Sequence, residues 1–513
     1  SSKPHAYPSL HAEDGREIMR SYVEVAHPEK GDPWRLHEKK WDLTQCVGKN
    51  VFLRLVSEPV GYSLGRNFAN AQVQLSFFVF DSFRVKGTIH ESASGKRQAW
   101  LKGDYEKSMD AIATELGDIV FAVRKADRDN HWYANIGHWA GDPERRLFHD
   151  GARLCRLDTR TGKRTVLLED ARGGIRDPQV HYDGKKILFS YRPGGSEYYN
   201  LYEIGIDGKG MRRITNAAYD DFEPSYLPDG RIVFVSTRCK RWVPCYFTEV
   251  ATLHSCNADG SGLRMLSSNV EHENAPWPMP DGKILYTRWE YMERSVLHFH
   301  HLWTANPDGT QQAVFYGNMH PDYVMIDAKP IPDSRKVACI FVPGHTRNEH
   351  EGTLTIVDPR NGPDDKSAIE CIGSTQIERD PYPIGNRGFL IAKKHEILIM
   401  DYQGRAKSIW RLSAGENKQS FMCQEPRPIA PRQRETCVPS QIDMSKDTGL
   451  LMLQDVYEGR NMKGVKPGQI KELMVIEVLP KSLNVSNGPE SISSISTFNH
   501  ERILGTVPVE ADG

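Results

Sequence analysis

Several features of membrane, nucleic-acid-binding and haem proteins are missing from this sequence. No apolar run approaches the roughly 20 residues that a membrane-spanning helix needs, so we expect no membrane span. The net charge is −1 with 26% charged residues. This balance gives no overall field to attract nucleic acid. No signal peptide is visible, but the sequence opens on Ser1 and not on Met, as it would after loss of a leader.

Cysteine is scarce, with nine in 513 residues, and an odd number cannot pair completely. Only Cys239/Cys245 and Cys423/Cys437 are close enough in sequence to suggest local disulfides or metal ligands. The haem-attachment motif Cys-x-x-Cys-His is absent. We therefore expect no covalent haem within these residues.

One pattern recurs along the middle of the chain: a short strand, a turn containing Asp-Gly and an apolar strand. It occupies residues 177–189, 223–234 and 275–286, with weaker copies at 329–337 and 382–386. Asp-Gly supplies the positive φ angles that tight hairpins require. A second set of Asp-led turns, at Asp158, Asp207, Asp259, Asp308, Asp358 and Asp401, interleaves with the first.

Two hairpins in each period of about 50 residues give four strands, the content of a β-propeller blade. Six such units fit between about residues 118 and 413. The sequence therefore predicts an all-β protein with a six-bladed propeller over 114–415. Further strands at 450–454 and 471–479 leave a seventh blade, a ring-closing strand or another domain as alternatives.

The flanking segments have a different pattern. Residues 1–113 predict a β-sandwich-like module with strands at 49–56 and 71–81. This module suits either a carbohydrate-binding accessory domain or a cap without a ligand. Residues 109–116 predict a short helical linker. Residues 416–513 predict closing strands and the start of a C-terminal domain.

Propeller geometry sorts the loops into two faces. The Asp-Gly hairpins lie on one side, the hairpin face. The loops between strands two and three, and the connections between blades, lie on the other, the loop face. Arg176, His272, Arg288 and His320 are predicted to bind an anionic ligand at the loop-face mouth. Alternatively, each arginine pairs with the acidic residue that opens the neighbouring blade.

Histidines also concentrate toward the loop face. Imidazoles and a thiolate meeting across adjacent blades would suit zinc or another divalent metal. The predicted ligands are His254, Cys256, His298, His300 and His301. The alternative is a set of hydrogen-bonded strand histidines.

A catalytic set is also predicted, built on the long loop of the first blade. His131 and His149 offer imidazoles beside aromatic residues. The later blades contribute Tyr191, Arg192 and Arg238 to the set. Histidine or tyrosine could transfer a proton beside a uronate carboxylate that arginines neutralise. Alternatively, the loop folds over its own Trp and Tyr side chains.

Residues 174–192, 221–239 and 298–303 resemble the propeller proteins related to the alpha subunit of hydrazine synthase, a group abundant in planctomycete-type bacteria. The resemblance covers roughly residues 115–513. It implies a six-bladed propeller, export to the periplasm or beyond, and a following C-terminal domain that can carry c-type haem.

Two classes of function follow. The chain is either the propeller portion of an exported metal- or haem-associated oxidoreductase, with a haem-bearing domain or partner subunit on its loop face, or a polysaccharide lyase or glycan-binding propeller for an anionic, uronic-acid-containing glycan.

Overall fold

The computed structural model describes 6–12, 17–20, 51–57, 109–479 and 501–510. Short gaps fall within the fourth range at 127–130, 135, 140–141, 244–245, 292–297, 321, 345–349, 444, 450, 452, 454 and 460–461. The chain divides into two compact units, 1–94 and 95–513. None of the helices described in these ranges is long and apolar enough to cross a membrane.

The first unit contains a three-stranded antiparallel sheet in the order β2-β1-β3. Its strands are β1 (Ala6–Ala12), β2 (Glu17–Arg20) and β3 (Val51–Ser57). The predicted strand at 49–56 corresponds to β3. The predicted strand at 71–81 lies outside the described residues.

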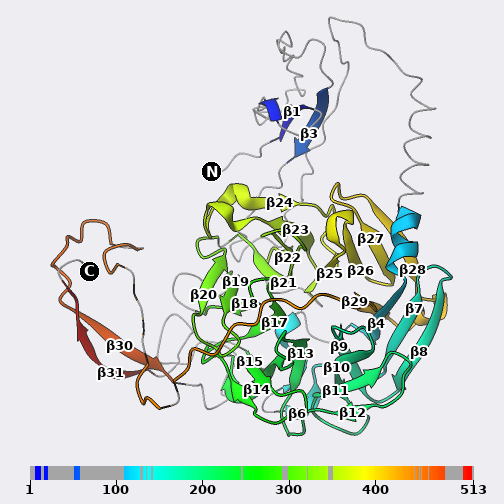
Figure 1. Ribbon diagram of the computed structural model, residues 1–513, viewed down its shortest axis with the longest axis horizontal. Coiled ribbons are helices and arrows are strands. Elements are labelled where there is room, and N and C mark those ends of the chain that lie inside the picture. The colour runs from blue at the N-terminus through cyan, green and yellow to red at the C-terminus, as the bar shows by residue number, and fades with distance from the viewer. Residues whose placement is uncertain are drawn as a thin grey trace, which may run out of the picture. The chain divides into compact units, whose positions relative to one another are not determined.

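The second unit carries six four-stranded antiparallel sheets, arranged as the blades of a propeller (Figure 1). Blade 1 is β29 (Phe421–Pro428), β4 (Asp118–Lys125), β7 (Ala152–Asp158) and β8 (Lys163–Asp170). Blade 2 is β9 (Gly174–Val180), β10 (Lys186–Arg192), β11 (Asn200–Gly205) and β12 (Arg212–Arg213). Blade 3 is β13 (Asp221–Tyr226), β14 (Ile232–Trp242), β15 (Glu249–Cys256) and β16 (Arg264–Met265).

Blade 4 is β17 (Glu273–Pro278), β18 (Ile284–Trp289), β19 (His300–Ala305) and β20 (Ala313–Tyr316). Blade 5 is β21 (Val324–Pro330), β22 (Val337–Val342), β23 (Thr353–Val357) and β24 (Ile369–Cys371). Blade 6 is β25 (Arg379–Pro383), β26 (Phe389–Lys393), β27 (Glu396–Met400) and β28 (Ala406–Arg411). The first strand of every blade contacts the first strands of both neighbouring blades, so these six inner strands surround the axis.

Short elements complete the second unit. Residues 109–116 are helical, as predicted. The 3-10 helix η2 (Trp132–Ala134) and the paired strands β5 (His138–Trp139) and β6 (Asp142–Arg146) lie between β4 and β7. The others are η4 (Pro359–Asn361), η5 (Lys366–Ala368), η6 (Gly385–Arg387) and α2 (Ala414–Lys418).

The ring is closed by a strand from the far end of the propeller sequence. β29 follows blade 6 in the chain but pairs antiparallel with β4, the first propeller strand (Figure 1). The six-bladed prediction is therefore confirmed, and the seven-bladed alternative is wrong. The predicted strand at 471–479 is β30 (Glu472–Val478), which pairs with β31 (Glu501–Pro508) in a separate two-stranded sheet.

After β29 the chain crosses the hairpin face. We call residues 429–441 the C-terminal strap. Its backbone donates from Arg432 N to Tyr182 O at 3.0 Å and from Thr436 N to Pro280 O at 3.3 Å. Ser440 Oγ donates to Asp308 Oδ2 at 3.1 Å. The strap therefore links hairpin turns of blades 2 and 4.

Each inner strand contains one residue with a positive φ angle, between 48° and 58°, at a break in the pairing register. The six positions are Asp177, Glu223, Ala275, Asp327, Asp380 and Glu425. A positive φ is uncommon for residues other than glycine and marks a conformation that the surroundings must hold in place. Its repetition in all six inner strands shows that the bulge is part of the blade design.

Carboxylates at these positions connect neighbouring blades. Glu425 Oε2 accepts from Asp177 N at 3.2 Å, and Asp177 Oδ2 accepts from Glu223 N at 3.0 Å. Glu223 Oε2 accepts from Ala275 N at 2.5 Å, and Asp380 Oδ2 accepts from Glu425 N at 2.9 Å. We call this set the carboxylate–amide ring. It satisfies buried N–H groups that the bulges remove from the strand ladder.

Replacing Asp177 by alanine tests the contribution of this ring to stability. The substitution removes the acceptor for Glu223 N, for Ser190 Oγ at 3.0 Å and for Arg176 Nε at 3.2 Å. Because these donors are buried, we expect a loss of about 3 kcal/mol in the free energy of unfolding, measured by urea denaturation.

The matched control is Asp207→Ala, which removes an exposed turn carboxylate whose backbone acceptor role is limited to Lys209 N. This variant is expected to lose less than about 1 kcal/mol. Equal losses in the two variants would show that the ring adds no special stability.

Candidate functional site

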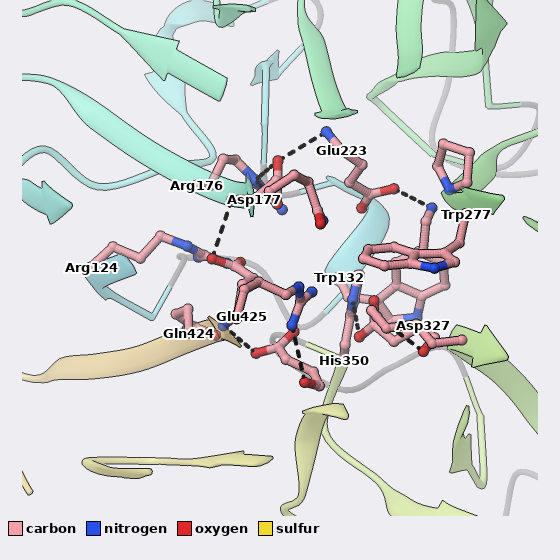
Figure 2. A pocket seen from close by; sticks show the side chains of 16 residues that line it. Arg124, Trp132, Arg176, Asp177, Glu223, Trp277, Asp327, His350, Gln424 and Glu425 are labelled. Carbon is pink, nitrogen blue, oxygen red and sulfur yellow. Dashed lines mark hydrogen bonds and ion pairs between the residues drawn. The ribbon is translucent and has the colours of Figure 1, made fainter. Parts of the chain in front are cut away.

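The inner strands enclose a narrow polar cavity of about 40 Å³ (Figure 2). A buried water needs at least about 10–15 Å³ of such space, so the cavity has room for an ion or a few water molecules. Its lining residues are Arg124, Trp132, Arg176, Asp177, Gln179, Glu223, Ala275, Pro276, Trp277, Asp327, Lys329, His350, Asp380, Gln424, Glu425 and Arg427.

Trp132, on η2, forms part of the cavity wall and is only 2% exposed. Its ring meets the His350 ring edge-on at 4.8 Å and the His300 ring at 5.7 Å between centroids. The indole N–H of Trp132 has no hydrogen-bond partner among the described residues. The loop between β4 and β7 thus brings a buried, unsatisfied donor to the channel.

Asp327, His350 and Asp380 form the chemically distinctive part of the cavity. One ligand atom from each lies within 4.8 Å of the others. His350 Nδ1 is 3.0 Å from Asp327 Oδ2. Burial lowers the pKa of His350, but the Asp327 carboxylate, together with Glu223 and Asp380, raises this pKa to about 9. Burial would raise the pKa of Asp327, whereas His350 holds it below its usual range.

The other carboxylates respond mainly to burial. Burial raises the pKa of Glu223 and that of Glu425 to about 7 each, from 4.5. It also raises the pKa of Asp380. Several groups of this cavity therefore change protonation near neutral pH, a property that accompanies functional sites more often than structural ones.

Four cationic side chains share the cavity. Arg124 Nη2 lies 3.1 Å from Glu425 Oε1, and Arg176 pairs with its neighbour Asp177. Lys329 is 3% exposed, and burial lowers its pKa to about 8. Together with Arg427 it brings positive charge beside the acidic ring.

Among the arginines predicted at the loop-face mouth, the structure brings Arg176 to the cavity. Arg238 pairs with Asp221 at 2.7 Å, at the start of its own blade's inner strand. Arg238 therefore forms an ion pair, as in the alternative interpretation of these arginines. The carboxylate, however, belongs to the same blade and not to the neighbouring one.

The remaining predicted anion ligands lie outside the cavity lining. Arg288 Nη1 donates to Gln312 Oε1 at 3.0 Å. His320 Nε2 lies 3.0 Å from Asp364 O. His272 is fully enclosed, and burial lowers its pKa to about 3, so this imidazole is neutral at pH 7.

The predicted catalytic residues are likewise not gathered at the cavity. Tyr191 Oη donates to Asp170 Oδ2 at 2.8 Å, and Arg192 pairs with Asp150 at 2.7 Å. His131 packs on the rings of Tyr133 and Tyr246, at 5.4 and 4.4 Å between centroids, while His149 is half-buried outside the cavity lining. The first-blade loop therefore folds over aromatic side chains.

The five predicted metal ligands do not form a common site. In the described ranges, Asp327, His350 and Asp380 make up the one group of three or more His, Cys, Asp or Glu whose ligand atoms approach within 4.8 Å. His254 Nδ1 lies 2.9 Å from Thr252 O, and His300 stacks on Trp289 at 4.6 Å. The remaining three predicted ligands are Cys256, His298 and His301. Burial raises the pKa of the Cys256 thiol to about 12.

The suggested local disulfides are not formed. Cys239, Cys423 and Cys437 are free thiols. Cys423 is buried in β29, whereas Cys437 is exposed on the strap. Cys245 lies outside the described residues.

Most of the carboxylate–amide ring and the Asp327–His350–Asp380 group were not among the residues predicted from the sequence. The missed signal was an acidic residue followed by proline at the start of the inner strands, as in 177–178, 223–224, 380–381 and 425–426. The fourth copy was aligned on Lys329-Pro330, two residues after the correct position, Asp327. His350 carries no local signal, because it arrives from the connection between β22 and β23.

No family model matches the sequence. The alpha subunit of hydrazine synthase from Kuenenia stuttgartiensis is 28% identical over 131 residues, which are 25% of this chain and 15% of that protein. A solved chain of Kuenenia stuttgartiensis hydrazine synthase aligns at 16% identity and a TM-score of 0.61, covering 79% of this chain and 64% of that chain. TolB from Acinetobacter baumannii aligns at 14% identity with a TM-score of 0.41, covering 60% of this chain and 66% of that one.

The second unit is thus a six-bladed β-propeller closed by β29, with a channel lined by carboxylates and cationic side chains together. In part of its sequence and in its fold, the chain is similar to the hydrazine synthase chains of Kuenenia stuttgartiensis. The chain spans less than two thirds of the length of either hydrazine synthase chain that it matches.

The Asp327–His350 ion pair predicts a pH-dependent stability. Because the pKa of His350 is raised from 6.5 to about 9, the pair contributes fully below pH 6.5 and is lost as pH rises through about 9. The pKa of Lys329 is lowered to about 8, so above pH 8 the loss of its proton in the folded state makes the free energy of unfolding rise with pH. We therefore expect the free energy of unfolding to fall between pH 6.5 and 8.

Urea denaturation at several pH values, with a chelator present, checks this slope. The His350→Gln variant should show a flatter dependence on pH than the unsubstituted protein. His395→Gln, at a half-buried histidine bonded to Phe421 O, should keep the original slope. A slope in His350→Gln as steep as that of the unsubstituted protein would contradict the assignment.

Proposed function

We propose that this chain is the propeller part of an exported, hydrazine synthase-like redox protein, and that the propeller holds one divalent metal ion in its channel. The observation that carries the metal assignment is the convergence of Asp327, His350 and Asp380 within 4.8 Å in a cavity of ion size. The similarity to hydrazine synthase supports the redox assignment.

A partner subunit is part of this proposal, because the curated relative is named as a subunit. The printed sequence has no Cys-x-x-Cys-His motif, so a c-type haem would belong to another domain or subunit. We place its docking on the loop face, where loops carried by a rigid scaffold are available for recognition. Oxidoreductase activity would belong to the assembled protein.

The donor set fits a divalent transition metal. Two carboxylate oxygens and one imidazole nitrogen suit zinc, manganese or ferrous iron better than a soft, thiolate-preferring ion. Asp380 Oδ2 accepts a hydrogen bond from Glu425 N. This bond would orient the carboxylate, as hydrogen bonds to metal-binding carboxylates commonly do. Such an ion would supply Lewis acidity to a small ligand in the channel.

A competing arrangement is the ion pair itself, since protonated His350 already neutralises Asp327. A metal ion would have to displace this proton, because a ligating imidazole is neutral. Metal binding should therefore release a proton and strengthen as pH rises. This behaviour separates a channel metal from adventitious binding to exposed carboxylates.

The residues predicted for a polysaccharide lyase or glycan-binding propeller do not support that alternative. The arginines predicted to neutralise a uronate carboxylate are engaged in ion pairs, as with Arg192 and Arg238.

Metal binding can be measured by isothermal titration calorimetry and by elemental analysis after dialysis. We expect one Zn²⁺ or Mn²⁺ per chain, with tighter binding at pH 8 than at pH 6. Asp327→Asn and Asp380→Asn should each weaken the affinity by at least about tenfold, since each removes an anionic ligand.

Asp322→Asn is the matched control, because this carboxylate is 58% exposed and lies in the connection between β20 and β21, just before the strand that carries Asp327. It should bind metal as the unsubstituted chain does. A one-to-one stoichiometry that all three variants retain would exclude the channel as the metal site.

A further inference from the structure

A second cavity, of about 220 Å³, lies beside the first and shares Gln179, Trp277 and Arg427 with it. We call it the vestibule. Its other lining residues include the last residues of inner strands and the beginning of the C-terminal strap, so it lies on the hairpin face. Its volume, about 220 Å³ against about 40 Å³ for the first cavity, is enough for a small organic molecule.

The vestibule is rich in positive charge. Three of its lining residues are arginines, and Glu115 is the single carboxylate among them. Glu115 is already paired with Arg387. Arg432, on the strap, pairs with Glu435 at 2.5 Å, which leaves other N–H groups of its guanidinium for a ligand.

Arg427 is the unusual member, because it is 4% exposed and makes no ion pair with a carboxylate in the described part of the chain. Its Nη1 donates to two backbone carbonyls, Asp380 O at 3.3 Å and Pro426 O at 3.0 Å. Its Nε has no hydrogen-bond partner among the described residues. A buried guanidinium with an unused donor is costly unless an anion completes it.

An aromatic wall accompanies these cations. The ring of Trp277 has Lys329 Nζ at 5.4 Å, Arg432 Cζ at 5.8 Å and Arg427 Cζ at 5.9 Å from its centroid. Tyr382 meets Trp277 edge-on at 6.0 Å between centroids. Two converging aromatic rings offer flat apolar surface next to the anion-binding groups.

We propose that the vestibule binds a small organic carboxylate, with its carboxylate on Arg427 and Arg432 and its body against Trp277 and Tyr382. The guanidinium groups supply the N–H donors, which match carboxylate geometry. None of its anion-binding groups is a ligand of the proposed channel metal, but Arg427 also lines the channel and donates to Asp380 O.

The test is calorimetric titration with benzoate in the presence of EDTA, with inorganic phosphate as a second probe. EDTA separates this site from the channel metal, so failure of either proposal leaves the other intact. Benzoate should bind below about 10 mM, and phosphate more weakly, because phosphate cannot use the aromatic wall.

Arg432→Gln is the informative variant, since Arg432 lies on the strap and outside the propeller sheets. It should weaken benzoate binding about tenfold. Arg434→Gln is the matched control: Arg434 lies two residues along the same strap and 4.5 Å over the Tyr182 ring, and it is absent from the vestibule lining. The affinity of the Arg434→Gln variant for benzoate should stay within about twofold of that of the unsubstituted chain.

Arg427→Lys provides a second measurement, because it keeps the buried charge but loses the forked donors. It should also weaken benzoate binding, with the melting temperature in ligand-free buffer reported alongside. No binding of benzoate by the unsubstituted chain, equal affinity for phosphate, or equal losses in Arg432→Gln and Arg434→Gln would each overturn the proposal.

Discussion

The structure depends on a set of hydrogen bonds from backbone amides to carboxylates on the neighbouring blade. An inner strand with a bulge leaves one amide outside its own sheet, and a buried amide needs an acceptor. The acidic side chain of the preceding blade supplies it, as Asp177 does for Glu223 N. The same residues therefore shape the bulge, join the blades and place carboxyl groups around the axis.

The ring is interrupted where blade 4 has Ala275, which has no carboxylate to offer to blade 5. On the far side of this interruption, Asp327 faces His350, and Lys329 lies two residues later on the same strand. A repetitive scaffold thus acquires one chemically distinct sector. Elsewhere around the axis, the positive-φ residues and their carboxylates hold neighbouring blades together. In this sector the charged side chains are available to bind a ligand.

The repeats allowed the blades, the hairpin turns and the number six to be predicted, because strand periodicity and Asp-Gly turns are local properties. The role of β29 was open, since its acidic-proline pair at 425–426 follows a segment where the regular spacing ends. The channel site was missed for a different reason. Asp327 and Asp380 come from different inner strands, and His350 comes from a connection, so their meeting is set by tertiary geometry.

The loop-face histidines show the opposite error. His298, His300 and His301 are dense in sequence and suggest metal chemistry, but His300 is buried and stacks on the ring of Trp289. Histidine density alone does not distinguish a ligand from a packed imidazole. The electrostatic environment, which a linear pattern does not contain, decides between them.

Closure by β29 also determines the order of events during synthesis. Arg124 and Glu425, which meet across the seam of blade 1, are separated by 301 positions. Blades 2 to 6 can form from nearby segments as they leave the ribosome, whereas β4 must wait, with an unpaired edge, until the last propeller strand has been translated. The nascent chain is therefore an open arc for most of its synthesis, and the slow, long-range step of its folding comes last.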